Sequence, residues 1–516
     1  MRLSSLLSMC ILCLSLPAAA QFPTELRIDT ARPIGTVRPL ILGNNLQWVD
    51  RGDEMFRADG EGFAPAMLEQ ARRMGVTMLR YPGGSLSDLY HWRDGIGPMA
   101  QRRDNEHFYS GNRQKVEVGT QEFLELCEAL GAEPLITVNV GSGKASDAAE
   151  WVKLVNVTGL SSRKSGKLLP RVRYWEIGNE PYLKDDKQKK LWMTPEVFAA
   201  RAQQFIHAMR AVDPAIEVAI PLRSDKIGGL PATPLPSFNE TVLKTISARF
   251  NQVALHNAYL PTAIDASYSD DQLYWASVGA SRTVQADFVA TRALLTRLQP
   301  EGTQIRLAVT EYNALFTLGK DTDGYLNSPA GALYVADLLR LFAYTPDLDY
   351  ANFWSLSGNW HFGAISRSGV TRPQGVVLSV FHEALKGRLL PVNVRTETVD
   401  TPRVGYVAAA NGVSKVKALA TIDDTKLRVL MINHDPQQAT AVAISFSDAR
   451  SWQGGRLRSW KGTARFDTRD VAGRLQAASQ QLAAGKNSAQ VQVPPLGLAL
   501  LELDLNAAAD REGVGK

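Results

Sequence analysis

Cysteine is scarce in this chain of 516 residues, which has only Cys10, Cys13 and Cys127. The first two fall in an N-terminal segment that we expect to be removed, so a disulfide framework is excluded and the folded chain must be held by its core. Cys127 lies beside leucines at helical spacing in "EFLELCEAL". We expect it to pack as a small apolar residue.

Clustered histidines and a surplus of one charge sign are also missing. The seven histidines are scattered without HxH or HExxH spacing, so we predict no metal site and no cofactor. The 57 Lys and Arg and 52 Asp and Glu leave a formal charge of only +5, and no basic block interrupts the chain. Proteins that bind nucleic acid or anionic membranes carry such blocks. We therefore expect no nucleic-acid partner.

Long apolar runs are absent, since no segment approaches the roughly 20 uninterrupted apolar residues of a membrane span. The first 20 residues, "MRLSSLLSMCILCLSLPAAA", instead combine Arg2, an apolar run from Leu6 to Leu16 and three alanines at the end. This is the layout of a cleavable secretory signal. We therefore expect a secreted or periplasmic protein whose mature chain starts at about Gln21.

Short β-rich runs do alternate with amphipathic segments between residues 38 and 388. Most of these runs are continuously apolar, as expected of parallel strands that are covered on both faces. Repeated strand-then-helix units predict an α/β fold, a (β/α)8 barrel. An open doubly wound sheet would need a Gly-rich turn after its first strand, and "GNNLQW" is not one. The expected strands are 40–48, 77–83, 134–141, 174–179, 217–222, 252–259, 305–313 and 350–356.

The pattern changes near residue 389. "KVKALATIDDTKLRVLMINHD", "TAVAISF" and "LGLALLELDL" are short alternating segments separated by polar turns. They predict an antiparallel β-sandwich. The predicted organisation is a signal peptide (1–20), an N-terminal strand that joins the sandwich (21–37), the catalytic barrel (38–388), the sandwich (389–505) and a disordered tail (506–516).

Polar residues gather at the predicted strand ends, and in such barrels the active site lies at the C-terminal ends of the strands. Two carboxylates with aromatic rings and no metal ligands favour glycoside hydrolysis. One carboxyl then protonates the leaving oxygen, while the other attacks the anomeric carbon or activates water. The candidate site residues are Arg80, Trp92, Asn139, Asn179, Glu180, His256, Tyr259, Glu311 and Trp354.

The stretch "RYWEIGNEPY" contains two glutamates, Glu176 and Glu180, that point the same way by strand parity. The pattern alone does not choose between them, because a strand-end glutamate is commonly a salt-bridge partner or a loop anchor. Glu180 and Glu311 are 131 positions apart (311 minus 180), which fits strands four and seven on opposite sides of a barrel mouth. A carboxyl separation of about 5 Å predicts retention of configuration, and about 6.5–9.5 Å predicts inversion.

Two of these strand ends resemble those of the clan A glycoside hydrolases: "NEP" after the fourth strand and "TEYN" after the seventh. The resemblance implies that Glu180 is the acid/base and Glu311 the nucleophile. It also implies that Asn179 holds the sugar 2-hydroxyl and that Glu176 has a supporting role.

Within the clan, "LRYPGGSLSDLYHWRDGIGP" (79–98) and "EPLITVNVGSGKASDAAEWVKLVN" (133–156) are similar to segments of the family 51 α-L-arabinofuranosidases, as is "LHNAYLP". This resemblance implies that Arg80, His256 and Tyr259 orient the nucleophile and the sugar, with Trp354 as a floor. It implies a retaining, arabinofuranosidase-like enzyme acting on plant cell-wall or other exogenous oligo- or polysaccharides.

Three departures from the family keep other specificities open. The first strand offers Asn44, Asn45 and Gln47 where the family usually supplies a Glu, and Ser85 stands where a Cys is common. "WEIGNEPY" and "VTEYNAL" are closer to xylosidase, endo-glycanase and glucuronidase relatives. The alternatives are therefore a β-xylosidase, a β-glucuronidase or an endo-glycanase of the same clan, and a non-catalytic carbohydrate-binding protein on a barrel scaffold.

Overall fold

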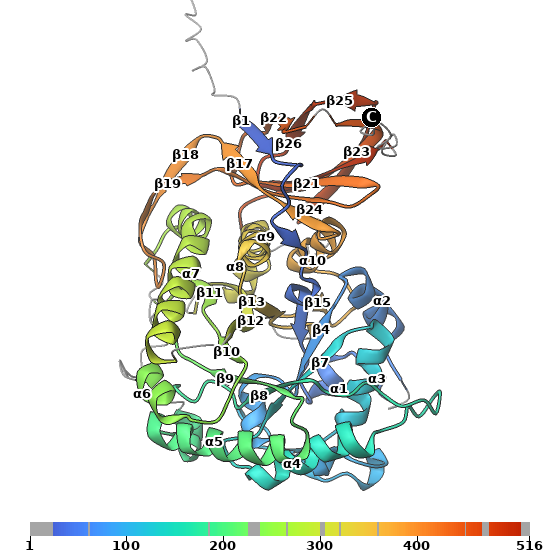
Figure 1. The fold of residues 1–516 in the computed structure, drawn as a ribbon, viewed down its shortest axis with the longest axis vertical. Coiled ribbons are helices and arrows are strands. Elements are labelled where there is room, and N and C mark those ends of the chain that lie inside the picture. Colours follow the sequence, from blue (N-terminus) through green and yellow to red (C-terminus); the bar gives the residue numbers. More distant parts are fainter. Residues whose placement is uncertain are drawn as a thin grey trace, which may run out of the picture.

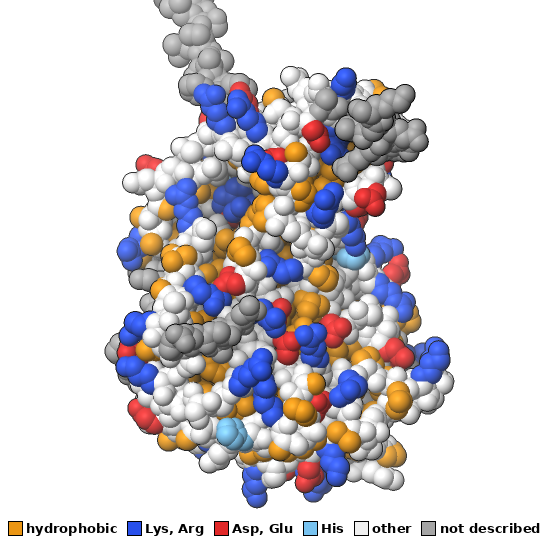
Figure 2. Space-filling view, in the orientation of Figure 1, with side chains coloured by type: hydrophobic (Ala, Val, Ile, Leu, Met, Phe, Trp, Pro, Cys, Tyr) orange, Lys and Arg blue, Asp and Glu red, His pale blue; other side chains and the backbone are white. Residues whose placement is uncertain are grey.

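The computed structural model describes residues 24–506 except 60–61, 184–185, 225–237, 265–266, 300–304, 319–320, 359–360, 449 and 467–473. The predicted signal peptide lies outside the described residues, and so does the predicted tail beyond Asn506. No helix in the described part of the chain is long and apolar enough to cross a bilayer. Basic and acidic side chains are interspersed over the face drawn in Figure 2.

A closed barrel of parallel strands forms the larger part of the molecule (Figure 1). The strands follow the order β10–β9–β8–β7–β4–β3–β13–β12, and the pairing of β10 with β12 closes the ring. The predicted (β/α)8 barrel is therefore confirmed. Its strands are β3 (Gly43–Asn45), β4 (Met78–Tyr81), β7 (Glu133–Val138), β8 (Tyr174–Ile177), β9 (Glu217–Pro221), β10 (Gln252–Leu255), β12 (Arg306–Thr317) and β13 (Leu348–Phe353).

The predicted sixth strand, 252–259, is divided in two. β10 ends at Leu255, and the chain resumes as β11 (Ala258–Ala263), which pairs with β12 alone. Between them the Asn257 side chain donates to Asp287 at 2.8 Å, which draws the chain out of the ring. As a result β11 runs beside the upper half of β12, with Ala258 opposite Tyr312.

Helices surround the barrel strands (Figure 1). The last two barrel helices begin on prolines, which suit a first helical turn because their missing N–H has no partner there. Cys127 is fully buried as a free thiol, as expected of a small apolar residue. The main helices are α2 (Pro65–Arg73), α3 (Thr120–Leu130), α4 (Ala145–Val152), α5 (Pro195–Val212), α6 (Phe238–Thr245), α7 (Asp270–Leu298), α9 (Pro329–Tyr344) and α10 (Pro373–Ala384).

Most of the chain after α10 folds into two further sheets beside the barrel, next to α9 and α10 (Figure 1). They enclose their own apolar core, which confirms the predicted sandwich. One sheet has the order β2–β16–β20–β21–β27–β23–β24 and is antiparallel. Its bounds are β2 (Gly35–Thr36), β16 (Arg388–Leu390), β20 (Val416–Ile422), β21 (Lys426–Asn433), β23 (Ser451–Gly462), β24 (Leu475–Leu482) and β27 (Gly497–Leu505).

The other sheet contains a strand from before the barrel. Its order is β17 (Val392–Arg395), β1 (Thr24–Ile28), β22 (Thr440–Phe446) and β26 (Ser488–Val493). β1 is antiparallel to β17 but parallel to β22, so this sheet is mixed rather than purely antiparallel as expected. The barrel is thus an insertion between two parts of one sheet.

A hairpin formed by β18 (Thr398–Thr401) and β19 (Ala410–Ser414) leaves the sandwich and runs along α7 (Figure 1, orange). Arg282 of α7 donates to the backbone carbonyls of Asn411 and Gly412, both at 2.8 Å. At the far end of the hairpin, the backbone N–H of Tyr406 donates to the carbonyl of Pro261 in β11 at 2.9 Å. The hairpin therefore joins the sandwich to the edge of the barrel.

Candidate active site

Two carboxylates from opposite sides of the barrel line one cavity of about 420 Å³. Glu180 lies just beyond β8 and Glu311 lies within β12. Nδ1 of His256 is 2.9 Å from Oε1 of Glu180 and 3.8 Å from Oε2 of Glu311. These two distances add to 6.7 Å, which is the greatest possible separation of those two carboxylate oxygens. The glutamates therefore face each other across a single pocket.

Arg80 of β4 is fully buried and holds several site residues at once. Its Nη1 donates to Glu311 at 2.8 Å and to Asn45 at 3.0 Å, and its Nη2 donates to Asn179 at 2.9 Å. Its Nε donates to Glu176 at 2.5 Å. Burial alone would lower the pKa of Arg80, but the charges of the two glutamates raise it above its usual value. Arg80 is therefore a fixed cation beside Glu311.

Glu176 is fully buried and does not line the cavity. Besides the bond from Arg80, its carboxylate accepts from the hydroxyls of Thr137 at 2.7 Å and Thr310 at 2.8 Å. Both of its oxygens are thus engaged inside the barrel. Of the two glutamates in "RYWEIGNEPY", only Glu180 reaches the cavity.

The two oxygens of Glu311 have different donors. Oε1 accepts from Arg80, and Oε2 accepts from the hydroxyl of Tyr259 at 2.9 Å. Burial and then the charge of Glu311 hold the pKa of Tyr259 well above its usual value, so the tyrosine keeps its proton. These charge-assisted bonds fix the position of the carboxylate.

His256 bridges the two sides of the site. Its Nε2 is 2.9 Å from the hydroxyl of Thr310, and its Nδ1 faces Glu180. Burial lowers the pKa of His256, but the charges of Glu311 and Glu180 outweigh burial and leave the pKa above its usual value. The imidazole thus lies between the two carboxylates, within hydrogen-bond distance of Glu180.

Trp354 follows β13 and forms one wall of the cavity. The backbone of Gly84 lies against it: a Cβ at Gly84 would lie 2.7 Å from the Trp354 ring and 3.3 Å from Oε1 of Glu311. Gly84 also has φ +44°, in the left-handed region that favours glycine. The "PGG" segment is therefore a site of close backbone approach.

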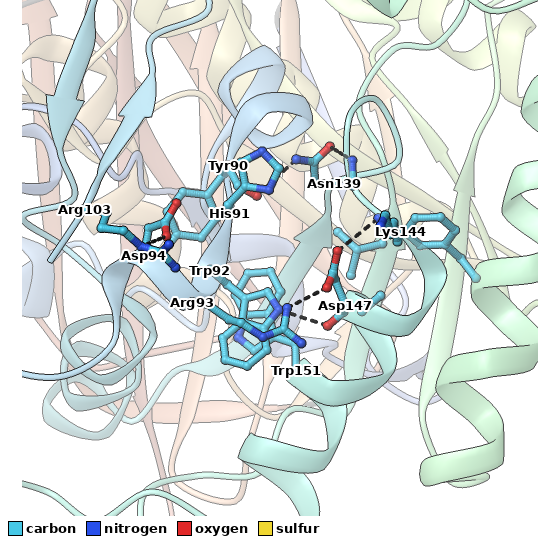
Figure 3. Close-up of a pocket in the computed structure, with 14 residues that line it drawn as sticks. Tyr90, His91, Trp92, Arg93, Asp94, Arg103, Asn139, Lys144, Asp147 and Trp151 are labelled. Carbon is cyan, nitrogen blue, oxygen red and sulfur yellow. Dashed lines mark hydrogen bonds and ion pairs between the residues drawn. The ribbon is translucent and has the colours of Figure 1, made fainter.

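The structure does not bring Trp92 and Asn139 to the two glutamates. Both line a separate cavity of about 260 Å³ (Figure 3). Trp92 stacks on Trp151 with ring centroids 5.9 Å apart and donates to the carbonyl of Asp147 at 2.9 Å. Asn139 accepts from the backbone N–H of Ser142 at 2.8 Å, so its amide holds the turn after β7. Neither residue is among those that line the glutamates' cavity: Trp92 packs on α4, and Asn139 caps a loop.

Asn179 lies beside Glu180 in a smaller adjoining cavity of about 60 Å³ that also includes Ser85 and Glu180. Its Oδ1 accepts from Arg80. Among the described residues, the structure shows no acceptor for the Nδ2 group of Asn179. This group can therefore donate to a molecule bound in the site.

Other residues of the main cavity were not predicted. Ser85 and Tyr182 belong to the motifs quoted above, so their positions in those motifs could have predicted that they lie near the site. Tyr406 had no such signal, because it comes from the hairpin of the other domain. The additional lining residues are Gly84, Ser85, Tyr109, Tyr182, Leu183, Arg223, Ser224, Thr262, Leu315, Leu318, Phe362 and Tyr406. Within the described ranges, no three His, Cys, Asp or Glu side chains are grouped so as to hold a metal ion.

The chain is similar to proteins named as arabinofuranosidases. Residues 70–227 match the family model for the alpha-L-arabinofuranosidase 1 domain. Alpha-L-arabinofuranosidase C of Emericella nidulans is 35% identical over 169 residues, which are 32% of this chain and 33% of that protein. The chain thus spans about a third of the length of the first curated relatives it matches.

Two similarities extend over most of the chain. A protein of Bacteroides ovatus named intracellular exo-alpha-L-arabinofuranosidase is 23% identical over 468 residues, 86% of this chain and 87% of that protein. The crystal structure of an alpha-L-arabinofuranosidase from Thermotoga maritima, in complex with arabinose, superposes with a TM-score of 0.79 at 21% identity. The superposition covers 93% of this chain and 100% of the Thermotoga maritima chain. These findings confirm the predicted resemblance to the arabinofuranosidases and the fold.

Proposed function

We propose that this protein is a retaining glycoside hydrolase of the α-L-arabinofuranosidase type. The observation that carries the proposal is the pair Glu180 and Glu311, which face each other across one cavity in different surroundings. Their upper separation of 6.7 Å (2.9 plus 3.8) includes the roughly 5–5.5 Å of retaining enzymes and excludes most of the 6.5–9.5 Å range of inverting ones. A non-catalytic binding protein would not need this pair.

The surroundings suggest which glutamate has which role. Glu311, held by Arg80 and Tyr259, would attack the anomeric carbon while Glu180 gives its proton to the leaving oxygen. One carbon–oxygen bond forms to Glu311 as the glycosidic bond breaks. Glu180 would then take a proton from water, which cleaves the glycosyl–enzyme bond and frees Glu311. Asn179 is suitably placed to hold the sugar 2-hydroxyl.

The substrate class and location are parts of the same proposal. The family match over residues 70–227 supports arabinofuranose units of plant cell-wall or other exogenous polysaccharides as the substrate. The signal-like first 20 residues support export, whereas the Bacteroides ovatus relative is named intracellular. Cell fractionation, with mass determination of the N-terminus, tests export: a chain starting at Met1 in the cytoplasm would contradict it.

A panel of aryl glycosides tests the activity and the sugar. We expect turnover of the α-L-arabinofuranoside. Turnover of the β-xyloside or of the β-glucuronide instead would identify a β-xylosidase or a β-glucuronidase, and cleavage of polymers alone would identify an endo-glycanase. Glu180→Ala and Glu311→Ala should each lower the rate by about three orders of magnitude or more. Glu196→Ala, at an exposed position on α5, is the control. An unaffected rate in either site variant, or sugar binding without turnover in the wild type, would refute the proposal.

A mechanism-based inhibitor tests the assignment of the nucleophile. An activated 2-fluoro sugar should trap a covalent adduct, and peptide mass spectrometry should locate it on Glu311. An adduct on Glu176 or Glu180 would contradict the assignment, because those residues are given other roles here.

A further inference from the structure

The catalytic cavity has a wall that comes from outside the barrel. We infer that Tyr406, at the tip of the β18–β19 hairpin, is a specificity-determining residue whose ring binds the sugar unit next to the one whose bond is cleaved. This inference rests on the proposed function and deepens it. It gives the sandwich a part in choosing the substrate, although both glutamates belong to the barrel.

The hairpin tip is held firmly against the barrel. Val404 and Val407 are fully buried and exchange backbone hydrogen bonds of 3.2 and 2.9 Å, which closes a tight turn. Gly405 has φ +52°, and a Cβ there would lie 2.2 Å from the carbonyl oxygen of Thr262 in β11. Only glycine allows this approach. With the bond from the Tyr406 backbone to β11, the turn fixes where the tyrosine ring lies.

β11 is also the strand that carries Tyr259, the donor to Glu311. The hairpin tip is thus seated three residues further along the same strand, at Thr262. Because β11 pairs with β12, which contains Glu311, the distance from the hairpin tip to the glutamate is set by one continuous piece of sheet. The backbone at Tyr406, from which the ring extends, is therefore positioned before any substrate binds.

Tyr259 donates its hydroxyl to Glu311 at 2.9 Å, whereas Tyr406 lines the same cavity without a hydrogen bond to either glutamate. The charges of Glu180 and Glu311 help to raise the pKa of Tyr182 and of Tyr259. Burial alone raises the pKa of Tyr406. Tyr406 therefore lines the cavity on the side where the hairpin tip meets β11, at Thr262. A single sugar at the glutamates would leave Tyr406 to the next unit.

The ring, rather than the hydroxyl, provides the contact. The Tyr406 hydroxyl oxygen is buried and has no hydrogen-bond partner among the described residues, while the residue as a whole is half-buried. The hydroxyl oxygen is therefore not part of the exposed surface, which leaves the ring to make the contact. Aromatic rings pack on the apolar C–H faces of sugars, and such a contact removes apolar area from water on both partners.

The test compares substrates with and without a second sugar. The variants are Tyr406→Ala and Tyr406→Phe, with Tyr344→Phe as the matched control. Tyr344 is also half-buried and joins α9 to the sandwich by donating to the carbonyl of Leu390 at 2.9 Å, but it does not line this cavity. The substrates are an arabinofuranose-substituted xylo-oligosaccharide and methyl α-L-arabinofuranoside, which has no second ring.

For Tyr406→Ala we expect KM on the oligosaccharide to rise about tenfold with kcat little changed, and kinetics on the methyl glycoside to stay within about twofold. Tyr406→Phe and the control should match the wild type on both substrates. An unchanged KM of Tyr406→Ala on the oligosaccharide, or an equal loss on both substrates, would overturn the inference. So would a loss in Tyr406→Phe as large as that in Tyr406→Ala.

The two proposals fail separately. If the wild type cleaves no arabinofuranoside, the proposed function has failed. Calorimetric binding of the same oligosaccharide to the wild type and to Tyr406→Ala then still decides the role of the ring. Equal affinity for the two proteins would reject it, and about tenfold weaker binding by Tyr406→Ala would support it.

Discussion

Replacing Glu176 or Glu311 by alanine should lower both stability and activity, but Glu176→Ala should lose more stability and Glu311→Ala more activity. Both glutamates accept from the same guanidinium of Arg80, at 2.5 and 2.8 Å. They differ in what surrounds them: Glu176 is fully enclosed, whereas Glu311 opens to the cavity. The comparison therefore separates a structural carboxylate from a chemical one within one hydrogen-bond network.

The cost to stability follows from the donors that each change leaves behind. Glu176→Ala strands Arg80 Nε and the hydroxyls of Thr137 and Thr310 in a site without water access. Breaking a buried ion pair from one side costs about 3–5 kcal/mol. Glu311→Ala removes one of the two acceptors of Arg80 Nη1 and the acceptor of the Tyr259 hydroxyl, both at the cavity wall, where water can replace the carboxylate. We expect that change to cost about 1–2 kcal/mol or less.

Activity should order the two variants the other way. Glu311→Ala removes the proposed nucleophile, so turnover should fall by about three orders of magnitude or more. Glu176→Ala keeps Glu311 but loosens the arginine that holds it, so we expect a loss of about 10- to 100-fold. The assays are thermal unfolding by calorimetry and initial rates on the substrate that the panel identifies. A Glu176→Ala protein with unchanged Tm and no turnover would refute this reasoning, because it would place the chemistry on Glu176.

Two further predictions concern single groups. Tyr259→Phe removes one of the two donors to Glu311, so kcat should fall about 10- to 100-fold with little change in KM, as steady-state kinetics would show; an unchanged kcat would contradict the role of that bond. Burial, aided by the charge of Lys417, lowers the pKa of His434 to about 3, so the unfolded chain takes up a proton below pH 6.5 that the native protein does not. The free energy of unfolding therefore falls by up to about 1.4 kcal/mol per pH unit as the pH drops from 6.5 toward 3. His434→Gln should make the decline of Tm over that range less steep. An identical pH slope in the variant would contradict it.

The fold was predictable because its signals are local. Continuous apolar runs mark the buried strands of the barrel, and each predicted run contains at least part of a strand. The break in the sixth strand was not predictable, since it depends on the bond from Asn257 to Asp287 of α7, 30 positions away. The parallel pairing of β1 with β22 is likewise set by a contact that no nearby residue encodes.

Strand parity could not choose between Glu176 and Glu180 for a specific reason. Parity holds only while the backbone stays extended, and β8 ends at Ile177. Gly178 has φ +74° and Glu180 has φ +43°, so the chain turns before the second glutamate. The first side chain therefore stays inside the barrel while the second reaches the cavity. A left-handed backbone at a non-glycine residue is costly and is found most often at functional sites.

Asn139 and Trp92 show the limit of reasoning from strand ends alone. A residue at the mouth of a barrel either faces the central pocket or supports the loop beside it, and residue type does not distinguish these roles. Asn139 uses its amide on the following turn, and Trp92 packs against Trp151 of α4. Tyr406 is the converse case, a cavity residue that no barrel motif contains.

The parallel neighbour of β1 has a consequence for how the chain reaches its folded form. The strand at 24–28 is made before the barrel, but its partners at 392–395 and 442–446 are made after it. Pairing between segments so far apart in the sequence is slow, because closing a long loop costs entropy. We therefore expect the barrel to fold before β1 pairs with β17 and β22. Loss of β1 would leave unpaired backbone N–H and C=O groups on the facing sides of β17 and β22. Exposed strand edges of this kind promote association between molecules. By pairing with β17 and β22, β1 therefore covers two strand edges through which copies of the protein could otherwise associate.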